Sequence, residues 1–198
     1  MPRAHPGIRL DLLVTEAALN LSKRDADVAL RATERPPETL VGRRIAKIAW
    51  AIYGAPAVLD RPFALADAAR FDWVGFGANL SGLPQARWLA SRVPAERQVC
   101  QINNTLGHAE CAAAGIGLAL VPCFIADRVP GLQRLAAPDE EFSTGLWLLT
   151  HQDLRHTARV RAFLDFVAAE VGRNRAVLEG EAALRASSQE AEPGSGTR

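Results

Sequence analysis

Residues 103–122, NNTLGHAECAAAGIGLALVP, contain the local signals that decide the fold. The Asn and Thr side chains at the start of this stretch can accept hydrogen bonds from the free N–H groups of a first helical turn. Apolar residues then recur at helical spacing from Leu106 onward, and Gly115 suits the left-handed conformation that ends many helices. The apolar run GLALV at 117–121 predicts a buried strand, which Pro122 would stop. A helix leading directly into a buried strand predicts an α/β unit.

Strand and helix patterns alternate along the rest of the chain, which is typical of an α/β protein. Apolar runs predict strands at 8–14, 25–31, 73–76, 99–103, 132–135 and 145–150, and one long strand or a successive pair at 40–53. Helical spacing predicts helices at 19–24, 65–69, 84–92, 106–114 and 157–171, with an exposed helix over 173–185. The polar residues 187–198, SSQEAEPGSGTR, predict a disordered tail.

Two breaks divide this pattern, one near Tyr53-Gly54 and one near Val121-Pro122. Two crossings between lobes form a hinge with a cleft, which is a usual place for a small ligand. We therefore expect one lobe from residues 1–53 and 124–171, a second lobe from 54–123, and an exposed helix with a disordered tail at 172–198.

The composition of the 198-residue chain is that of an ordinary globular protein, with 48% apolar and 23% charged residues. Its 23 basic and 22 acidic residues leave a net charge of +1, so we expect no DNA binding by this chain alone. There is neither a signal peptide nor an apolar run of the roughly 20 residues that a membrane helix needs, so we expect a cytoplasmic protein without membrane contact. Cys100, Cys111 and Cys123 form no CxxC pair, which favours buried, reduced thiols.

The start of the helix at 106–114 is the best candidate for a binding site. The backbone N–H groups and the helix dipole at residues 103–105 favour an anion. Simple capping without a ligand explains the same residues and is the commoner case, so both interpretations stay open.

The other constellations predict no metal, no cofactor and no catalysis. His108 and Cys111 stand three apart, but no second pair of ligands follows them. GFG at 75–77 begins like a dinucleotide-binding motif, yet Leu80 occupies the position of the third glycine. The four histidines are scattered, and no nucleophile has a neighbouring base, so we expect no enzyme activity.

Several segments, in this order, together resemble the effector-binding domain of LysR-type transcriptional regulators. They are HPGIRL at 5–10, DADVALR at 25–31, LVGRRI at 40–45 followed by YGAP at 53–56, AAAGIGLALVP at 112–122 and RVRAFLDFV at 159–167. The resemblance runs from about His5 to Val171. It implies two Rossmann-like lobes of the type 2 periplasmic-binding-protein kind, a small effector in the cleft between them, homo-oligomers and a role in transcription regulation.

The resemblance also implies where the effector binds. The site residues would be Arg31, Thr33, Tyr53, Asn104, Thr105, Val121 and Phe124. A stand-alone solute-binding protein of the same fold is the alternative. An enzyme on that fold is a further alternative, which the missing nucleophile–base pair disfavours.

Compared with the family pattern, this sequence starts late. The winged helix-turn-helix, the linker helix, and the first strand and first helix of the sensing domain have no counterpart, because Met1 falls just before the second strand. In the family that first strand lies in the middle of the first lobe's sheet. We therefore expect strands 8–14 and 25–32 to flank a gap and the first lobe to be loose, whereas the second lobe, 54–122, keeps its elements and should stay folded.

Overall fold

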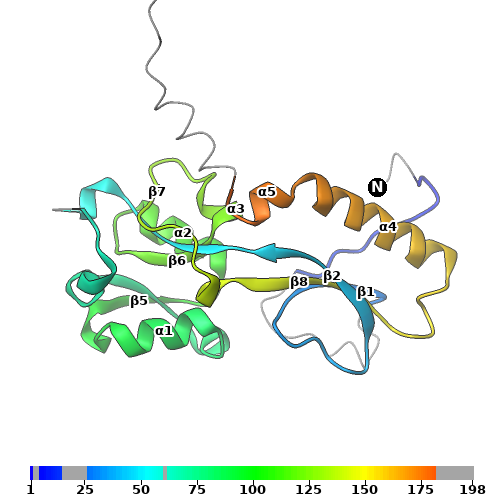
Figure 1. Cartoon of the computed structure of the whole chain (residues 1–198), viewed down its shortest axis with the longest axis horizontal. Coiled ribbons are helices and arrows are strands. Elements are labelled where there is room, and N and C mark those ends of the chain that lie inside the picture. The colour runs from blue at the N-terminus through cyan, green and yellow to red at the C-terminus, as the bar shows by residue number, and fades with distance from the viewer. Residues whose placement is uncertain (2–4, 15–25, 60–61, 182–198) are drawn as a thin grey trace, which may run out of the picture.

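A computed structural model describes residues 1, 5–14, 26–59 and 62–181. The described chain forms two lobes side by side, joined where β2 continues into β3 and where β8 begins (Figure 1). We call the part built on β1, β8 and β2 the first lobe, and the part built on β3 to β7 the second lobe.

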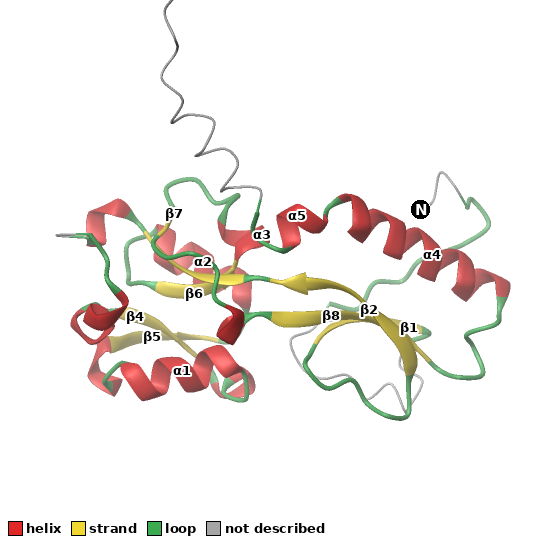
Figure 2. Ribbon diagram, viewed as in Figure 1, coloured by secondary structure: helices red, strands yellow, loops and turns green. Residues whose placement is uncertain are grey.

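The first lobe is a three-stranded antiparallel sheet covered by one long helix. Its strand order is β1-β8-β2, with β1 at Val28–Ala32, β8 at Thr144–Thr150 and β2 at Val41–Ile48. Helix α4 (Ala158–Arg173) lies along one face of the sheet (Figure 2). The apolar stripe that predicted this helix packs Leu164 and Val167 against the sheet.

The second lobe has a mixed sheet with helices around it. One group of strands has the order β6-β3-β7, with β6 at Ala119–Pro122, β3 at Trp50–Gly54 and β7 at Gln133–Arg134. A second group is the parallel pair of β4 (Trp73–Phe76) and β5 (Gln98–Ile102). A bridge between Trp73 and Leu118 links the two groups. The helices are α1 (Pro84–Arg92), α2 (Thr105–Ala113), α3 (Cys123–Ala126) and, at the junction of the lobes, α5 (Arg175–Leu178). Short 3-10 turns lie at Pro56–Val58, Leu65–Arg70, Ala78–Leu80, Ala95–Arg97 and Glu140–Phe142.

A single apolar core runs through the junction of the lobes. Leu148 of the first lobe and Trp73 of the second belong to one continuous cluster of buried side chains. Trp88 stacks edge-on against both Trp73 and Phe142, with ring centroids 5.9 and 5.2 Å apart, and Phe142 lies just before β8. The lobes are therefore packed against each other as well as tied by their connecting strands.

Most of the predicted elements are present within a residue or two. Helix 84–92 and strand 73–76 form as predicted, the apolar stretch 40–53 is a successive strand pair, and Gly115 has the expected left-handed φ of 77°. Of the thiols, all free, Cys123 is buried, but Cys100 and Cys111 are only half-buried. The predicted helix 19–24 and the tail 187–198 lie outside the described residues.

The predicted strand at 8–14 is wrong. These residues form no strand, and Leu12 and Val14 are 72% and 96% exposed. Alternation of apolar and polar residues makes a strand possible, but a strand is stable only beside a partner, and none of the described residues pairs with this segment. The sequence around 8–14 therefore contains a strand pattern without a place in a sheet.

The chain changes sheets at positions that differ from the predicted crossings. It passes from β2 to β3 at Ala49, four residues before Tyr53, and it returns to the first lobe between Arg134 and Thr144 rather than near Phe124. The breaks in the hydrophobic pattern at Gly54 and Pro122 mark strand ends inside the second lobe. Among the described residues, no helix is both long and apolar enough to cross a membrane.

Candidate functional site

Strands β1 and β2 of the first lobe and β4, β5 and β6 of the second lobe direct their carboxyl ends toward the junction. Strand β3 enters the second lobe at the crossing, so its antiparallel neighbour β6 ends there, and β4 and β5 run in the same direction as β6. In the first lobe, β2 ends at the crossing and β1, antiparallel to β8, also ends on that side. In α/β proteins, ligands bind beyond the carboxyl ends of strands. The junction is therefore where a ligand is expected.

Helix α2 begins at this edge with a side-chain cap. The Asn104 side-chain oxygen accepts a hydrogen bond from the Gly107 N–H at 2.7 Å. The preceding loop is fixed to the end of β4, because Gly77 N–H donates to the Ile102 carbonyl at 2.8 Å and the Asn79 amide donates to the Asn103 carbonyl at 3.0 Å. Asn104 is exposed and Thr105 is half-buried, so solvent reaches the positive end of the helix dipole.

On the first lobe, polar side chains gather where β1 ends beside the start of β8. Thr33 donates its N–H to the Gly145 carbonyl at 2.9 Å, and the Gly145 N–H donates to the Glu34 carboxylate at 3.0 Å. A Cβ at Gly145 would lie 2.9 Å from the Trp147 ring nitrogen and 3.2 Å from Arg44 Nε. Thr33 is among the predicted site residues, whereas its neighbours Glu34, Arg44 and Trp147 are not, because strand pairing rather than spacing along the chain brings them together.

Tyr53 is buried within the second lobe and contacts two partly exposed charged residues. Its side chain is 1% exposed, and its hydroxyl donates to Asp127 Oδ1 at 2.6 Å. Arg134 donates from Nε to that hydroxyl at 3.0 Å, from Nη2 to Asp127 Oδ2 at 2.5 Å, and from Nη1 to the Gly180 carbonyl at 2.8 Å. We call these three residues the Tyr53–Asp127–Arg134 triad. The Tyr53 hydroxyl is thus engaged inside the lobe and does not face a cleft in this structure.

Burial raises the pKa of Tyr53 far above that of a free tyrosine, and the hydrogen bond to Asp127 raises it further. Burial also raises the pKa of the neighbouring Cys123 thiol. Both groups are therefore neutral at neutral pH, and Tyr53 acts as a hydrogen-bond donor.

This pKa shift predicts a loss of stability at alkaline pH. Above pH ~10 an unfolded chain ionises its tyrosine while the folded chain keeps the proton, so the free energy of unfolding should fall by about 1.4 kcal/mol per pH unit. Tyr53 is the chain's one tyrosine, so tyrosinate absorbance and urea unfolding both report on it. Tyr53→Phe should lose this part of the pH dependence; an unchanged slope between the two proteins would contradict the assignment.

Of the other predicted site residues, Arg31 lies in β1 opposite Trp147 of β8, and two lie deeper in the second lobe. Val121 is fully buried and pairs with Ala51 across β6 and β3. Phe124 is partly buried against the shared core. The structure therefore brings Asn104 and Thr105 together at the start of α2, whereas Val121 lies in the interior of the lobe. The seven-residue effector site stays a prediction.

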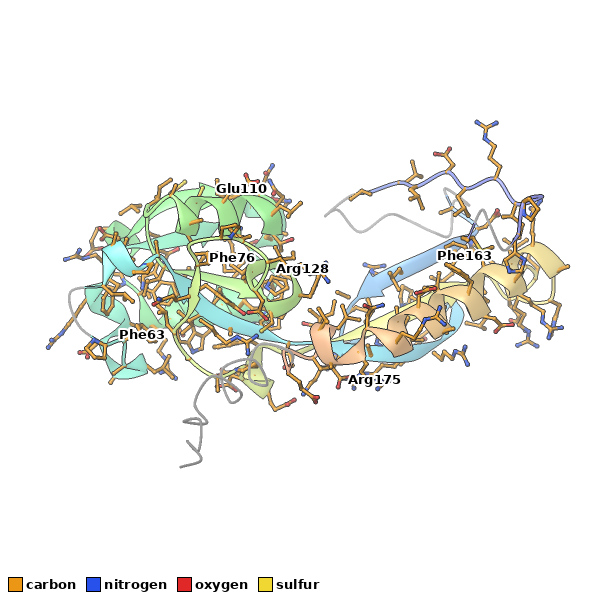
Figure 3. All side chains as sticks on the ribbon, turned by 90° about the horizontal axis from the view of Figure 1, so that it is seen from above. Phe63, Phe76, Glu110, Arg128, Phe163 and Arg175 are labelled. Atoms are coloured by element: carbon orange, nitrogen blue, oxygen red, sulfur yellow. The ribbon has the colours of Figure 1, made fainter. Side chains whose placement is uncertain are left out.

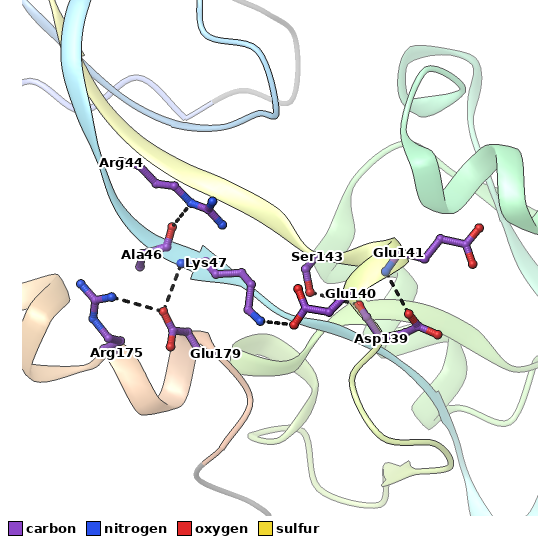
Figure 4. Close-up of polar contacts among 9 residues, drawn as sticks. All are labelled: Arg44, Ala46, Lys47, Asp139, Glu140, Glu141, Ser143, Arg175 and Glu179. Atoms are coloured by element: carbon purple, nitrogen blue, oxygen red, sulfur yellow. Dashed lines mark hydrogen bonds and ion pairs between the residues drawn. The ribbon is translucent and has the colours of Figure 1, made fainter.

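Polar contacts brace the junction on the side of α5 (Figure 4). The Lys47 ammonium group pairs with Glu140, and the Lys47 N–H donates to the Glu179 carboxylate at 3.3 Å. Arg175 pairs with Glu179 at 3.5 Å and also donates to the Ile45 carbonyl at 2.9 Å. In Figure 3, Arg175 of α5 lies near the junction of the lobes, where these contacts form. The segment Arg175–Gly180 therefore contacts β2 of the first lobe and, through the Gly180 carbonyl, Arg134 of the second lobe.

Two cavities open away from the predicted site. One, of about 330 Å³, lies at the outer end of the second lobe, and the other, of about 350 Å³, lies between α4 and the sheet of the first lobe. Neither is lined by a predicted site residue. In the first cavity Arg97 is already paired with Asp72 at 2.9 Å.

Comparison with known families identifies this architecture. The model of the LysR substrate binding domain matches residues 2–172. The chain belongs to the LysR substrate-binding domain family. A search of curated protein sequences gave no significant match.

Solved structures of this family have the same fold. The chain is similar to the regulatory domain of CrgA, a LysR-type transcriptional regulator from Neisseria meningitidis, with a TM-score of 0.69 and 22% identity over 86% of this chain and 88% of that domain. It is also similar to the AmpR effector-binding domain from Citrobacter freundii, with a TM-score of 0.70 and 14% identity over 87% and 88% of the two chains. Against the longer CrgA structure, the match covers 61% of that chain. These likenesses confirm the expected type 2 periplasmic-binding-protein-like fold.

Proposed function

We propose that this LysR substrate-binding domain senses a small effector at the junction of its two lobes. The observation that carries the proposal is that strands of both lobes end toward the junction, and that the capped, solvent-reachable start of α2 directly follows one of them, β5. Binding there would bridge the lobes, and a ligand that contacts both lobes favours one of their relative arrangements. Family membership supports this role over a stand-alone solute-binding protein.

The donors at the junction favour a small carboxylate or another anion. The Thr105 hydroxyl and the dipole of α2 would meet one end of the ligand, and Arg31 and Thr33, on the strand end opposite, would meet the other. Asn104 positions the first turn, because its side chain already caps it. Tyr53, Val121 and Phe124 would shape the wall from within rather than bind directly. We further propose that the domain is cytoplasmic, works as a homo-oligomer and has no catalytic activity.

The test is a screen of small mono- and dicarboxylates by thermal shift, followed by calorimetry on each compound that raises the melting temperature. Thr105→Val should weaken the binding of such a compound by roughly 10- to 100-fold, the effect of losing a hydrogen bond to a charged group. Leu106→Ala is the matched control, because Leu106 is the next residue and is exposed. Equal affinities for wild type and Thr105→Val would place the effector elsewhere, and turnover of any compound would overturn the absence of catalysis.

A further inference from the structure

Two of the chain's three cysteines meet in the second lobe. Cys100 is in the middle of β5, Cys111 is in the last turn of α2, and both are free and half-buried. Their thiols are in contact, close enough for a hydrogen bond between them. Because each side chain is partly exposed, a small molecule in solution can reach the pair.

The packing of α2 on β5 holds the two thiols together. Helix α2 leads from β5 to β6, and both strands run in the direction of β4, so the helix runs back along β5. At Gly107 the helix lies so close to the strand that a Cβ would be 2.7 Å from Ile102 Cγ2. From Gly107 one helical turn, about 6 Å, leads to Cys111, and from Ile102 two strand residues, roughly 6.6 Å, lead back to Cys100 on the same face of the sheet. The two steps match in length, which places Cys111 over Cys100.

The number of donors limits the class of ligand that this pair takes. Among the described residues, no group of three or more His, Cys, Asp or Glu side chains could hold a metal ion, so the pair does not belong to the four-ligand set that zinc needs. Burial raises the pKa of the Cys111 thiol, and the neighbouring Cys100 raises it further. Cys111 therefore keeps its proton at neutral pH, which disfavours oxidation and disulfide exchange, because these reactions start from a thiolate.

We propose that Cys100 and Cys111 form a second ligand site, which takes a monosubstituted trivalent arsenical, R–As(OH)₂. Each thiol replaces one hydroxyl group on arsenic, so two As–O bonds break and two As–S bonds form. The two thiol protons leave with the hydroxyl groups as two molecules of water. Arsenic stays trivalent, so the reaction needs neither an oxidant nor a reductant, and the bound group adds no net charge to the half-buried site. The site is separate from the junction of the lobes, because Cys111 lies at the opposite end of α2 from Thr105.

Phenylarsine oxide, which hydrates to such a compound, is the probe. The full chain is first reduced with a phosphine, which is then removed. Native mass spectrometry should show a single adduct, and the melting temperature should rise, because the bound arsenic links β5 to α2 in the folded chain. An excess of a small 1,2-dithiol should remove the adduct, whereas the same concentration of a monothiol should not, because two bonds to one molecule are replaced efficiently only by another pair of thiols.

Single cysteine variants test whether both thiols bind. Cys100→Ser and Cys111→Ser should each weaken binding by about 100- to 10,000-fold, because only one As–S bond remains. Cys123→Ala is the control: it also removes a thiol, but one that is buried beside Tyr53, and it should bind the probe like wild type. Circular dichroism checks that each variant is folded. A reduced wild type that takes no arsenical, or a folded serine variant that binds it as tightly as wild type, would overturn the proposal.

Discussion

Replacing Arg134 with methionine is expected to lower the free energy of unfolding by about 2–4 kcal/mol, somewhat less than the roughly 3–5 kcal/mol for removing one partner of a fully buried ion pair, because Asp127 is partly exposed. The Arg134 and Asp127 side chains are only 11% and 19% exposed, so Asp127 would keep a charge with little water to solvate it. The variant also loses the hydrogen bonds to Tyr53 and to the Gly180 carbonyl. Methionine keeps much of the volume, so the loss comes from charge and hydrogen bonding rather than from a cavity.

Urea unfolding followed by far-ultraviolet circular dichroism measures this loss. Arg97→Met is the matched control, because Arg97 pairs with Asp72 at 2.9 Å but both side chains are about half exposed. An exposed pair contributes at most about 1 kcal/mol, so this variant should unfold almost like wild type. Similar losses in the two variants would show that burial does not increase the contribution of the Arg134–Asp127 pair to the free energy of unfolding.

The triad shows why part of the candidate site could not be read from the sequence. Tyr53 and Arg134 are 81 residues apart, and they meet only because β7 pairs with β3. Spacing along the chain contains no such information, so Tyr53 was predicted as a cleft residue when its hydroxyl faces Asp127. The Asn104 cap was predictable, because a cap depends on residues within one helical turn.

The same distinction explains the fold. Helix 84–92 was predicted to the residue because Pro84 and the local apolar spacing define it. Segment 8–14 has an equally regular local pattern, yet it forms no strand, because a strand needs a neighbouring strand to pair with, and that neighbour comes from residues far away in the sequence. The crossings were misplaced for a related reason: Tyr53-Gly54 and Val121-Pro122 are real strand ends, but which sheet each strand joins is decided by pairing.

Trp73→Ala is expected to cost about 3–5 kcal/mol, the usual loss for removing a fully buried tryptophan side chain. Trp73 is fully buried in the cluster that both lobes share, and its ring stacks edge-on against Phe63 and Trp88. Its ring N–H donates to the Ala68 carbonyl at 2.8 Å, so the variant leaves a cavity and also removes one of the two hydrogen bonds that this carbonyl accepts.

Because the shared core joins the lobes, this loss should spread beyond the second lobe. Hydrogen exchange in Trp73→Ala should speed up in β8 of the first lobe as well as in β4 and β6. Trp147→Ala is the control: Trp147 is half-buried on the face of the sheet away from α4, so its removal should cost less and leave exchange in β4 unchanged. Faster exchange confined to the second lobe in Trp73→Ala would mean that the lobes unfold separately, and that the packing of Trp88 on Phe142 does not couple them.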